Sequence, residues 1–342
     1  MGKIKVALAG FGTGGRIFHA PFIDAHPQFE LKYVYERSRK TAQEIYPYVK
    51  SLSSYEELVD TDSDLVVIAL PNDLHYSAVR QALLKGKNVV CDKPFCPDSR
   101  SAAELFELAE SKGLFLTVYQ NRRLDSQVRT AKKLLSEGIL GDIYDCTMRF
   151  QRFQTARNKK LWKSSDPTTG IIYDLGIHLI DSAYYLFGMP KAVFCDVRTL
   201  HPFNTVCDRA DISFYYESGL KVTLALSQAA CKAEDALVIH GSKASFCKEG
   251  EDPQEKRLNE GMSPRDPRLT LEDEDARGRL YYPDKSFSYY PQVSGGYIDF
   301  YTSVFEGLEG GEPFVDKRQA VDVLRLLEAS IISNSQKRII EL

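Results

Sequence analysis

Asp174 and His178 suggest acid–base chemistry by their types and by their spacing within Asp174–Asp181, DLGIHLID. Residues four apart share one face of a helix, so a helix here brings the carboxylate beside the imidazole. A histidine accepts a proton near neutral pH, and a carboxylate one turn away orients it and stabilises its charged form. The alternatives are a core histidine satisfied by the neighbouring aspartate, or a metal site, for which a third strong ligand is missing nearby. The pattern favours a general base, and we expect no metal.

Lys93 is a second candidate, because Asp92-Lys93-Pro94 directly follows the short apolar run Asn88–Cys91. If that run is a buried strand, the lysine lies at the edge of a sheet where ligands bind, and not on an ordinary solvated surface. There it can donate to a substrate oxygen and favour the alkoxide form. Taken alone, the tripeptide is common and fits an ordinary loop equally well.

The stretch Lys3–Gly15, KIKVALAGFGTGG, predicts a strand followed by a turn that binds a dinucleotide. Its glycines have the G-x-G-x-x-G spacing, at the end of a strand and before a helical segment, which favours nucleotide binding over an ordinary turn. The first glycine permits a tight turn, the second leaves room for a pyrophosphate, and the third lets the next helix pack closely. We expect the cofactor to contact Gly10, Gly12, Thr13, Gly14 and Gly15.

Glu36 and Arg37 follow the second expected strand, Phe29–Tyr35. An acidic residue about twenty positions after the glycine turn binds the ribose hydroxyls of NAD, whereas a nearby arginine accepts the 2′-phosphate of NADP. Glu36 also fits a solvated charge at the end of a strand. A 2′-phosphate beside its carboxylate costs on the order of 1–4 kcal/mol near a protein surface. We therefore expect NAD as the cofactor, with NADP as the alternative.

The segments that position these residues alternate between strands and helices as far as residue 121. The run Asp64–Leu70 is nearly all apolar, as expected for a parallel strand buried on both faces. Such alternation predicts a doubly wound parallel sheet, whose ligands bind at the carboxyl ends of the strands. Besides the glycine turn and Glu36, those ends carry Leu70, Pro71, Asn72, His75, Asp92, Lys93, Gln120 and Asn121, which we expect to contact the cofactor.

The alternation stops in the remainder of the chain, so we expect a dinucleotide-binding domain over 1–121 and a second domain over 122–342. Consecutive strand-like runs joined by turns predict a mostly antiparallel sheet there, making the second domain α+β. These runs are Ile143–Phe153, Ala192–Thr199, Asp211–Tyr216, Lys221–Gln228 and Ala236–His240. The polar stretch Lys248–Gln292 shows no clear period, and we expect long surface loops with at most one helix. We expect helices over Ser126–Glu137, Thr169–Phe187, Gly296–Glu306 and Lys317–Ser335.

Composition excludes several classes of function. The chain has 342 residues, 43% of them hydrophobic and 27% charged, as in a globular protein of two domains. Its net charge of −3 gives no reason to expect a nucleic acid or a membrane as partner. The 7 cysteines lack C-x-x-C spacing, which fits a reducing compartment. Without a signal peptide or an apolar run of bilayer length, we expect a cytoplasmic protein.

Together these motifs resemble the glucose–fructose oxidoreductase and inositol dehydrogenase family, Gfo/Idh/MocA, over nearly the whole chain. The shared stretches are GFGTGG, LPNDLH, CDKPF, YQNRR and DLGIHLID, whose order and spacing are specific together. The phrases GRIFHAP and NRRLDS look like the subgroup near scyllo-inositol dehydrogenases. One departure is Asp92, where the family usually has glutamate; aspartate keeps the carboxylate but reaches less far toward the nicotinamide ribose.

The resemblance implies a Rossmann domain and a second domain whose open sheet forms a homodimer or a dimer of dimers. The implied reaction is reversible hydride transfer between NAD(P) and a hydroxyl carbon of a sugar, inositol or related polyol. The implied catalytic group is Lys93, Asp174 and His178, and Trp162 matches a tryptophan that approaches the nicotinamide. We also expect a cis Lys93–Pro94 peptide. Alternatives of other classes are a non-catalytic NAD(P)-binding regulator and an NAD-dependent glycosidase.

Overall fold

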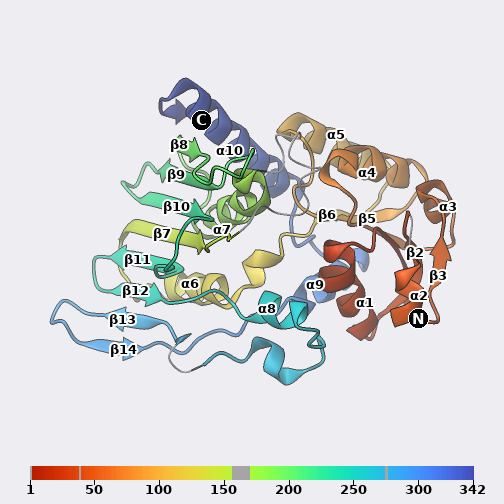
Figure 1. Ribbon diagram of the computed structural model, residues 1–342, viewed down its shortest axis with the longest axis horizontal. Coiled ribbons are helices and arrows are strands. Elements are labelled where there is room, and N and C mark those ends of the chain that lie inside the picture. The colour runs from red at the N-terminus through yellow and green to blue at the C-terminus, as the bar shows by residue number, and fades with distance from the viewer. Residues whose placement is uncertain (1, 38–39, 156–169, 274–275) are drawn as a thin grey trace. The chain divides into compact units, whose positions relative to one another are not determined.

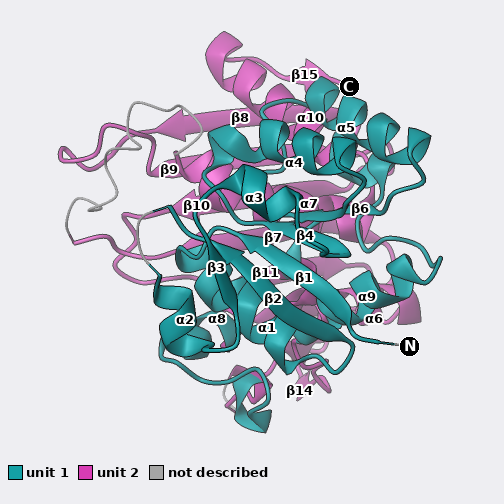
Figure 2. Ribbon diagram, turned by 90° about the vertical axis from the view of Figure 1, so that its right-hand side faces the viewer, with its two compact units in different colours: residues 1–121, 254–269, 296–321 teal, residues 122–253, 270–295, 322–342 magenta. Residues whose placement is uncertain are grey.

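The computed structural model describes residues 2–37, 40–155, 170–273 and 276–342. The chain forms two compact units, which are coloured separately in Figure 2. Unit 1 comprises Met1–Asn121, Gln254–Leu269 and Gly296–Val321, and unit 2 comprises Arg122–Pro253, Thr270–Gly295 and Asp322–Leu342. One border between the units coincides with the boundary expected after residue 121. Two segments beyond that boundary nevertheless return to unit 1, where Val315, for example, exchanges hydrogen bonds with the Thr117 side chain.

Unit 1 contains a parallel sheet of six strands in the order β3-β2-β1-β4-β5-β6, and every neighbouring pair is parallel. This confirms the predicted doubly wound sheet. The four residues of β4 are completely buried, which explains their unbroken apolar run. The short β3 has no visible period and was not expected. The strands are β1 (Ile4–Ala9), β2 (Phe29–Tyr35), β3 (Lys50–Leu52), β4 (Leu65–Ile68), β5 (Asn88–Cys91) and β6 (Leu116–Val118).

The helices of unit 1 connect these strands. After β1 the chain forms a π-helical segment, η1 (Gly14–His19), and then α1 (Ala20–Ala25). Pro21 lies in the first turn of α1, where its missing N–H leaves no intrahelical hydrogen bond unmade. The proline therefore divides the segment into two short helices. The other helices are α2 (Thr41–Ile45), α3 (Tyr55–Val59), η2 (Asn72–Leu74), α4 (His75–Leu84), α5 (Ser99–Ser111), α8 (Gln254–Asn259) and α9 (Ile298–Leu308).

Unit 2 contains a sheet of nine strands in the order β14-β13-β12-β11-β7-β10-β9-β8-β15. Figure 1 shows the strands from β14 to β8 side by side. Neighbouring strands of the sheet are antiparallel except β7 and β10, which confirms a mostly antiparallel sheet. The strands are β7 (Ile143–Gln151), β8 (Ala192–Arg198), β9 (Arg209–Tyr215), β10 (Lys221–Ser227), β11 (Leu237–Gly241), β12 (Ser245–Lys248), β13 (Arg279–Tyr281), β14 (Phe287–Tyr289) and β15 (Ile340–Glu341).

The stretch Lys248–Gln292 is more ordered than a set of loops with one helix. Besides α8, it contains the 3₁₀ segment η7 (Pro267–Thr270) and the hairpin of β13 and β14. The strands of this hairpin have only three residues each, and β14 is exposed throughout. Strands so short and exposed lack the alternation of apolar and polar residues that reveals a strand in a sequence.

The helical segments of unit 2 carry the polar residues Asp174, His178 and Asp181 of the DLGIHLID motif. The segments are η3 (Asn121–Leu124), α6 (Ser126–Glu137), the π-helical η6 (Ile172–Gly176), α7 (Ile177–Phe187) and the part of α10 (Lys317–Gln336) that begins at Asp322. Segment η6 contacts β9 and β10, and α7 contacts α6 and β10. A Cβ on Gly176 would lie 3.5 Å from Leu226 of β10. This distance is an ordinary van der Waals contact, so the glycine of DLGIHLID lies against the sheet without being required by it.

Candidate functional site

The glycine turn after β1 has the close contacts that the motif requires. Gly10 has φ of +100°, and a Cβ on it would lie 2.5 Å from the Ala69 carbonyl oxygen. A Cβ on Gly15 would lie 1.9 Å from the carbonyl oxygen of Gly10, so η1 packs directly on the turn. By contrast, a Cβ on Gly12 would meet no atom within 4 Å of it. The turn therefore presents an open backbone surface at Gly12, held in shape by the close contacts at Gly10 and Gly15.

Gln120 adds a polar group at the end of β6. Its side chain is only 4% exposed, and its Oε1 accepts no hydrogen bond from the residues that the structure describes. A buried acceptor without a donor is uncommon in proteins, and an ordered water or a bound group can satisfy it. The open backbone at Gly12 and the amide oxygen of Gln120 therefore fit a nicotinamide dinucleotide, which offers a pyrophosphate and amide or hydroxyl donors.

Asp92 lies between the glycine turn and Lys93. Its Oδ2 would be 2.9 Å from a Cβ on Gly14, and its Oδ1 accepts a 2.8 Å hydrogen bond from the Lys93 N–H. Burial alone would raise the pKa of Asp92, but His19, Lys93 and His75 together hold it below its ordinary value. Asp92 is therefore a carboxylate beside the turn. The Lys93–Pro94 peptide is cis, as expected.

His75 connects two of the loops at the ends of the strands. It is 1% exposed, and its Nδ1 and Nε2 lie 2.7 Å and 2.9 Å from the carbonyl oxygens of Pro94 and Leu70. Both ring nitrogens are thus engaged by backbone. In this arrangement the ring fixes the loop after β4 to the loop after Lys93. His75 therefore acts on a bound cofactor by positioning these two loops. Pro71 and Asn72 are half-buried on the same loop.

Glu36 lies at the end of β2, where the sequence places the ribose-binding acid. Its Oε1 accepts a 2.5 Å hydrogen bond from the Thr41 hydroxyl, and its Oε2 accepts a 2.8 Å bond from the Ala42 N–H. The carboxylate therefore caps the first turn of α2 and complements the positive end of that helix. Arg37 is exposed beside it. Glu36 is thus neither an ordinary solvated charge nor free to swing away.

The second candidate group belongs to unit 2. Asp174 is exposed on η6, whereas His178 on α7 is only 5% exposed, with its ring 6.5 Å from that of Phe150 in a T-shaped contact. Segment η6 is π-helical, and π turns within helices are frequent at functional sites. The other π-helical segment described above is η1, which directly follows the dinucleotide turn. The helical segment at the dinucleotide turn and the one that contains Asp174 thus both depart from regular α-helix.

Asp181, the third polar residue of DLGIHLID, has a structural partner. Arg123 holds it in a two-point ion pair, with Nε to Oδ2 at 2.9 Å and Nη2 to Oδ1 at 2.7 Å. Both side chains are 1% exposed. Arg122 lies with its guanidinium carbon 5.5 Å from the centre of the Phe150 ring that contacts His178. Sequence reasoning missed these two arginines, although the NRR of YQNRR marks the place.

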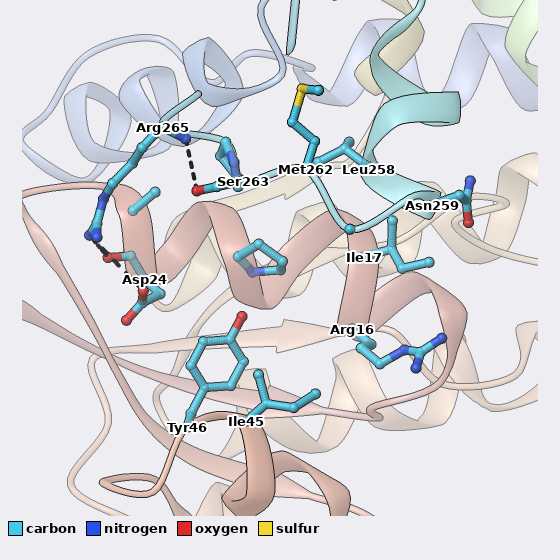
Figure 3. A pocket seen from close by; sticks show the side chains of 14 residues that line it. Arg16, Ile17, Asp24, Ile45, Tyr46, Leu258, Asn259, Met262, Ser263 and Arg265 are labelled. Atoms are coloured by element: carbon cyan, nitrogen blue, oxygen red, sulfur yellow. Dashed lines mark hydrogen bonds and ion pairs between the residues drawn. The ribbon is translucent and has the colours of Figure 1, made fainter. Parts of the chain in front are cut away.

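A pocket of about 370 Å³ in unit 1 lies apart from these groups (Figure 3). Arg16 and Ile17 of η1, Tyr46 and Met262 are among the residues that line it. Figure 3 shows the Tyr46 hydroxyl directed into the pocket, and burial together with Asp24 raises the pKa of Tyr46 to about 12. None of the residues expected to bind the cofactor lines this pocket, so we do not assign the cofactor to it.

The structure brings together most of the predicted residues of unit 1. The glycine turn, the β4 loop, His75, Asp92 and Lys93 are linked by the contacts above. In the same sheet, Glu36 and Arg37 follow β2, the neighbour of β1, and Gln120 and Asn121 follow β6, the neighbour of β5. Asp174 and His178 lie in unit 2. Trp162 lies outside the described residues. Within the described ranges, no helix is long and apolar enough to cross a membrane. Nor do His, Cys, Asp or Glu residues form a group of three that could hold a metal ion there.

Comparison with known proteins identifies the family. Residues 4–120 match an oxidoreductase family with an NAD-binding Rossmann fold, and residues 128–247 match the GFO/IDH/MocA C-terminal domain. An uncharacterised oxidoreductase of Schizosaccharomyces pombe is 38% identical over 100% of both chains. The scyllo-inositol 2-dehydrogenase (NADP(+)) IolW of Bacillus subtilis is 31% identical over 99% of this chain and 96% of its own.

A solved structure of an oxidoreductase from Bacillus cereus has a TM-score of 0.90 to this chain, with 26% identity and 99% of each chain covered. The family models, the full-length relatives and the fold therefore agree with the resemblance that the motifs carry. The chain belongs to the Gfo/Idh/MocA family of oxidoreductases and is an enzyme with a nicotinamide-binding Rossmann unit.

Proposed function

We propose that this enzyme transfers a hydride between NAD(P) and a hydroxyl carbon of a sugar, inositol or related polyol. The observation that carries the proposal is the placement of Asp174 in η6 and of His178 four residues later in α7, in a chain whose other unit has an open dinucleotide turn. The name of IolW, which acts on scyllo-inositol, supports a polyol as substrate. We also propose a homodimer or dimer of dimers that uses the sheet of unit 2.

The proposed roles follow from the chemistry of each side chain. A bound nicotinamide supplies the hydride acceptor for oxidation and the hydride donor for reduction. In oxidation His178 takes the hydroxyl proton, and Asp174 orients the imidazole and stabilises its charged form. Lys93 donates to the developing alkoxide and stabilises it. In reduction His178 returns the proton.

A panel of inositols, aldoses and sugar acids, each tested with NAD and with NADP, tests the proposal. Absorbance of the reduced nicotinamide reports turnover. At least one cyclic polyol or sugar should give turnover that depends on both substrate and cofactor. Cofactor binding without turnover on any compound would favour a regulator, and cleavage of glycosides without net reduced nicotinamide would favour a glycosidase.

Gly12→Ala and Gly15→Ala form a matched pair for the cofactor turn. A methyl group on Gly12 meets no atom of the protein within 4 Å, so the protein should fold normally while its side chain blocks the approach of the pyrophosphate. A methyl group on Gly15 lies 1.9 Å from a carbonyl oxygen, so it should reduce stability as well as binding. NADH and NADPH titrations and thermal unfolding measure the two effects. Normal cofactor affinity in Gly12→Ala would show that the pyrophosphate does not bind at this turn.

We propose NAD as the preferred cofactor. Thr41 and Ala42 hold the Glu36 carboxylate at the end of β2, so its charge remains where a 2′-phosphate would lie. Exposed Arg37 argues for NADP, as does the name of IolW. Glu36→Gln removes the charge but keeps an oxygen for capping α2, and it should improve NADPH binding and weaken NADH binding. Titration of the wild type decides the preference, and tenfold tighter binding of NADPH would contradict it.

A further inference from the structure

His19 is a completely buried residue of η1 to which the proposed mechanism gives no role. Its Nδ1 lies 2.7 Å from the hydroxyl of Tyr301 on α9, and its Nε2 faces Oδ2 of Asp92 at 3.7 Å. This Nε2 makes no hydrogen bond with any residue in the described part of the chain. The imidazole therefore connects a buried tyrosine to the carboxylate beside the glycine turn.

The hydrogen bond with Tyr301 and the nearby Asp92 carboxylate together favour one tautomer of His19. Tyr301 is completely buried, and burial raises its pKa well above the ordinary value, so its hydroxyl keeps its proton. If this hydroxyl donates to Nδ1, the proton of the neutral ring lies on Nε2 and points toward the carboxylate. The opposite tautomer would direct the lone pair of Nε2 at a carboxylate, which is unfavourable. The geometry thus selects the tautomer protonated at Nε2.

Asp92 has little freedom on its other sides. Its Oδ1 is bonded to the Lys93 N–H, and its Oδ2 lies near the position of a Cβ on Gly14. A shift of the carboxylate would break its hydrogen bond to the Lys93 backbone and change the space that Oδ2 occupies beside Gly14 of the turn. Of the groups in contact with Asp92, His19 is the one that faces Oδ2 from the core.

We propose that Tyr301 and His19 form a relay that positions the Asp92 carboxylate against the glycine turn and so sets the affinity for the nicotinamide cofactor. His19 is a positioning residue in this relay and exchanges no proton with substrate. The inference rests on the proposed function, because it assumes that the turn binds a nicotinamide dinucleotide. It assigns roles to two residues that the sequence motifs leave unexplained.

His26 provides a matched control for the alternative that His19 only joins helices in the core. His26 is 6% exposed at the end of α1, and its Nε2 lies 3.3 Å from the hydroxyl oxygen of Thr302 on α9. Both histidines thus bond to neighbouring hydroxyl residues of one helix. Only His19 faces Asp92 in the described structure. His26→Asn should lower stability without a specific effect on cofactor binding.

Two substitutions of His19 separate its two contacts. Asparagine places its amide near the position of Nδ1, so His19→Asn keeps a partner for Tyr301 and loses the group that faces Asp92. Glutamine places its amide near the position of Nε2, so His19→Gln keeps a donor toward Asp92. We expect His19→Asn to weaken NADH binding by about threefold to tenfold, as for loss of a charge-oriented contact of 3.7 Å that is longer than a hydrogen bond. His19→Gln should retain most of the affinity.

A double-mutant cycle with Asp92→Asn tests whether His19 acts through Asp92. Dissociation constants are measured by NADH and NADPH fluorescence on the full-length protein, with thermal unfolding alongside. In the Asp92→Asn background, His19→Asn should change the affinity by less than about twofold, because the two residues act as one unit. Independent effects that multiply would overturn the relay, as would equal losses of affinity in His19→Asn and His26→Asn.

Nitrogen-15 NMR of the His19 imidazole supplies a readout that needs no cofactor. The wild type should show the neutral tautomer protonated at Nε2, and Tyr301→Phe should shift the ring toward the other tautomer. The Nδ1-protonated tautomer in the wild type, or a spectrum insensitive to Tyr301→Phe, would overturn the relay. Failure of the wild type to bind either cofactor while this tautomer is present would instead contradict the proposed function and restrict the relay to a structural role.

Discussion

His178→Ala is expected to lower kcat by roughly 10²–10⁴, the range for losing a general base, with the cofactor dissociation constant unchanged. Alanine cannot take the hydroxyl proton, while the glycine turn and the other described residues proposed to hold the dinucleotide lie in unit 1. Steady-state kinetics on the best substrate of the panel gives kcat, and NADH titration gives the affinity.

His240→Ala is the matched control for this substitution. His240 lies on β11 of the same unit, and its Nδ1 is 2.8 Å from the Ser245 hydroxyl oxygen. It has no part in the proposed mechanism, so kcat should stay within about twofold of the wild-type value, as expected for an independent site. If His178→Ala instead lost cofactor affinity and stability together with activity, His178 would be a structural residue.

Arg123→Met is expected to destabilise unit 2 by about 3–5 kcal/mol, because it leaves the Asp181 carboxylate buried without its counter-charge. The pair is 1% exposed on both sides, so water does not replace the lost partner. Methionine keeps much of the volume of the arginine stem, and this limits the contribution of a cavity. Denaturant unfolding followed by circular dichroism measures the change in the free energy of unfolding.

The double variant Arg123→Met with Asp181→Leu is the control that isolates the charge. Replacing both members of a buried ion pair by apolar residues is often neutral, so the double variant should be more stable than Arg123→Met alone. If the two substitutions instead destabilised additively, the loss would reflect packing of α7 against η3, and the ion pair would have little role.

The sequence predicted the parallel sheet of unit 1 well, because its signals are local. A completely apolar run marks β4, and the spacing of Gly10, Gly12 and Gly15 marks the turn after β1. The close contacts of Gly10 and Gly15 are what this spacing implies. Such features depend on neighbouring residues and can therefore be predicted from the sequence.

Contacts between residues far apart in the chain could not be predicted in this way. Tyr301 and His19 are separated by 282 positions, and Asp181 and Arg123 by 58. No sequence periodicity relates partners so far apart. The sequence therefore indicated neither the role of His19 in GRIFHAP nor the ion-pair partner of Asp181. The capping role of Glu36 was missed because a strand-end acid gives the same signal whether it binds ribose or caps α2.

In the stretch Lys248–Gln292 the one expected helix is present as α8, but the interpretation of the rest as loops was wrong, for a different reason. Loops of this length without secondary structure are uncommon inside a compact domain. Their rarity alone predicts that such a stretch contains helices or strands. The structure shows α8 and the hairpin of β13 and β14 there. Weighing loop length beside periodicity would have indicated some of this structure.

Transfer of deuterium tests the central claim most directly. Inositols and aldoses that carry deuterium on all ring carbons are incubated with the enzyme and the cofactor that it binds more tightly. We predict that the reduced nicotinamide contains one deuterium per molecule and that its amount equals the amount of ketone or lactone formed. Reduced nicotinamide without deuterium, or glycoside cleavage with no net reduction of the cofactor, would contradict hydride transfer from a hydroxyl carbon as the function of this protein.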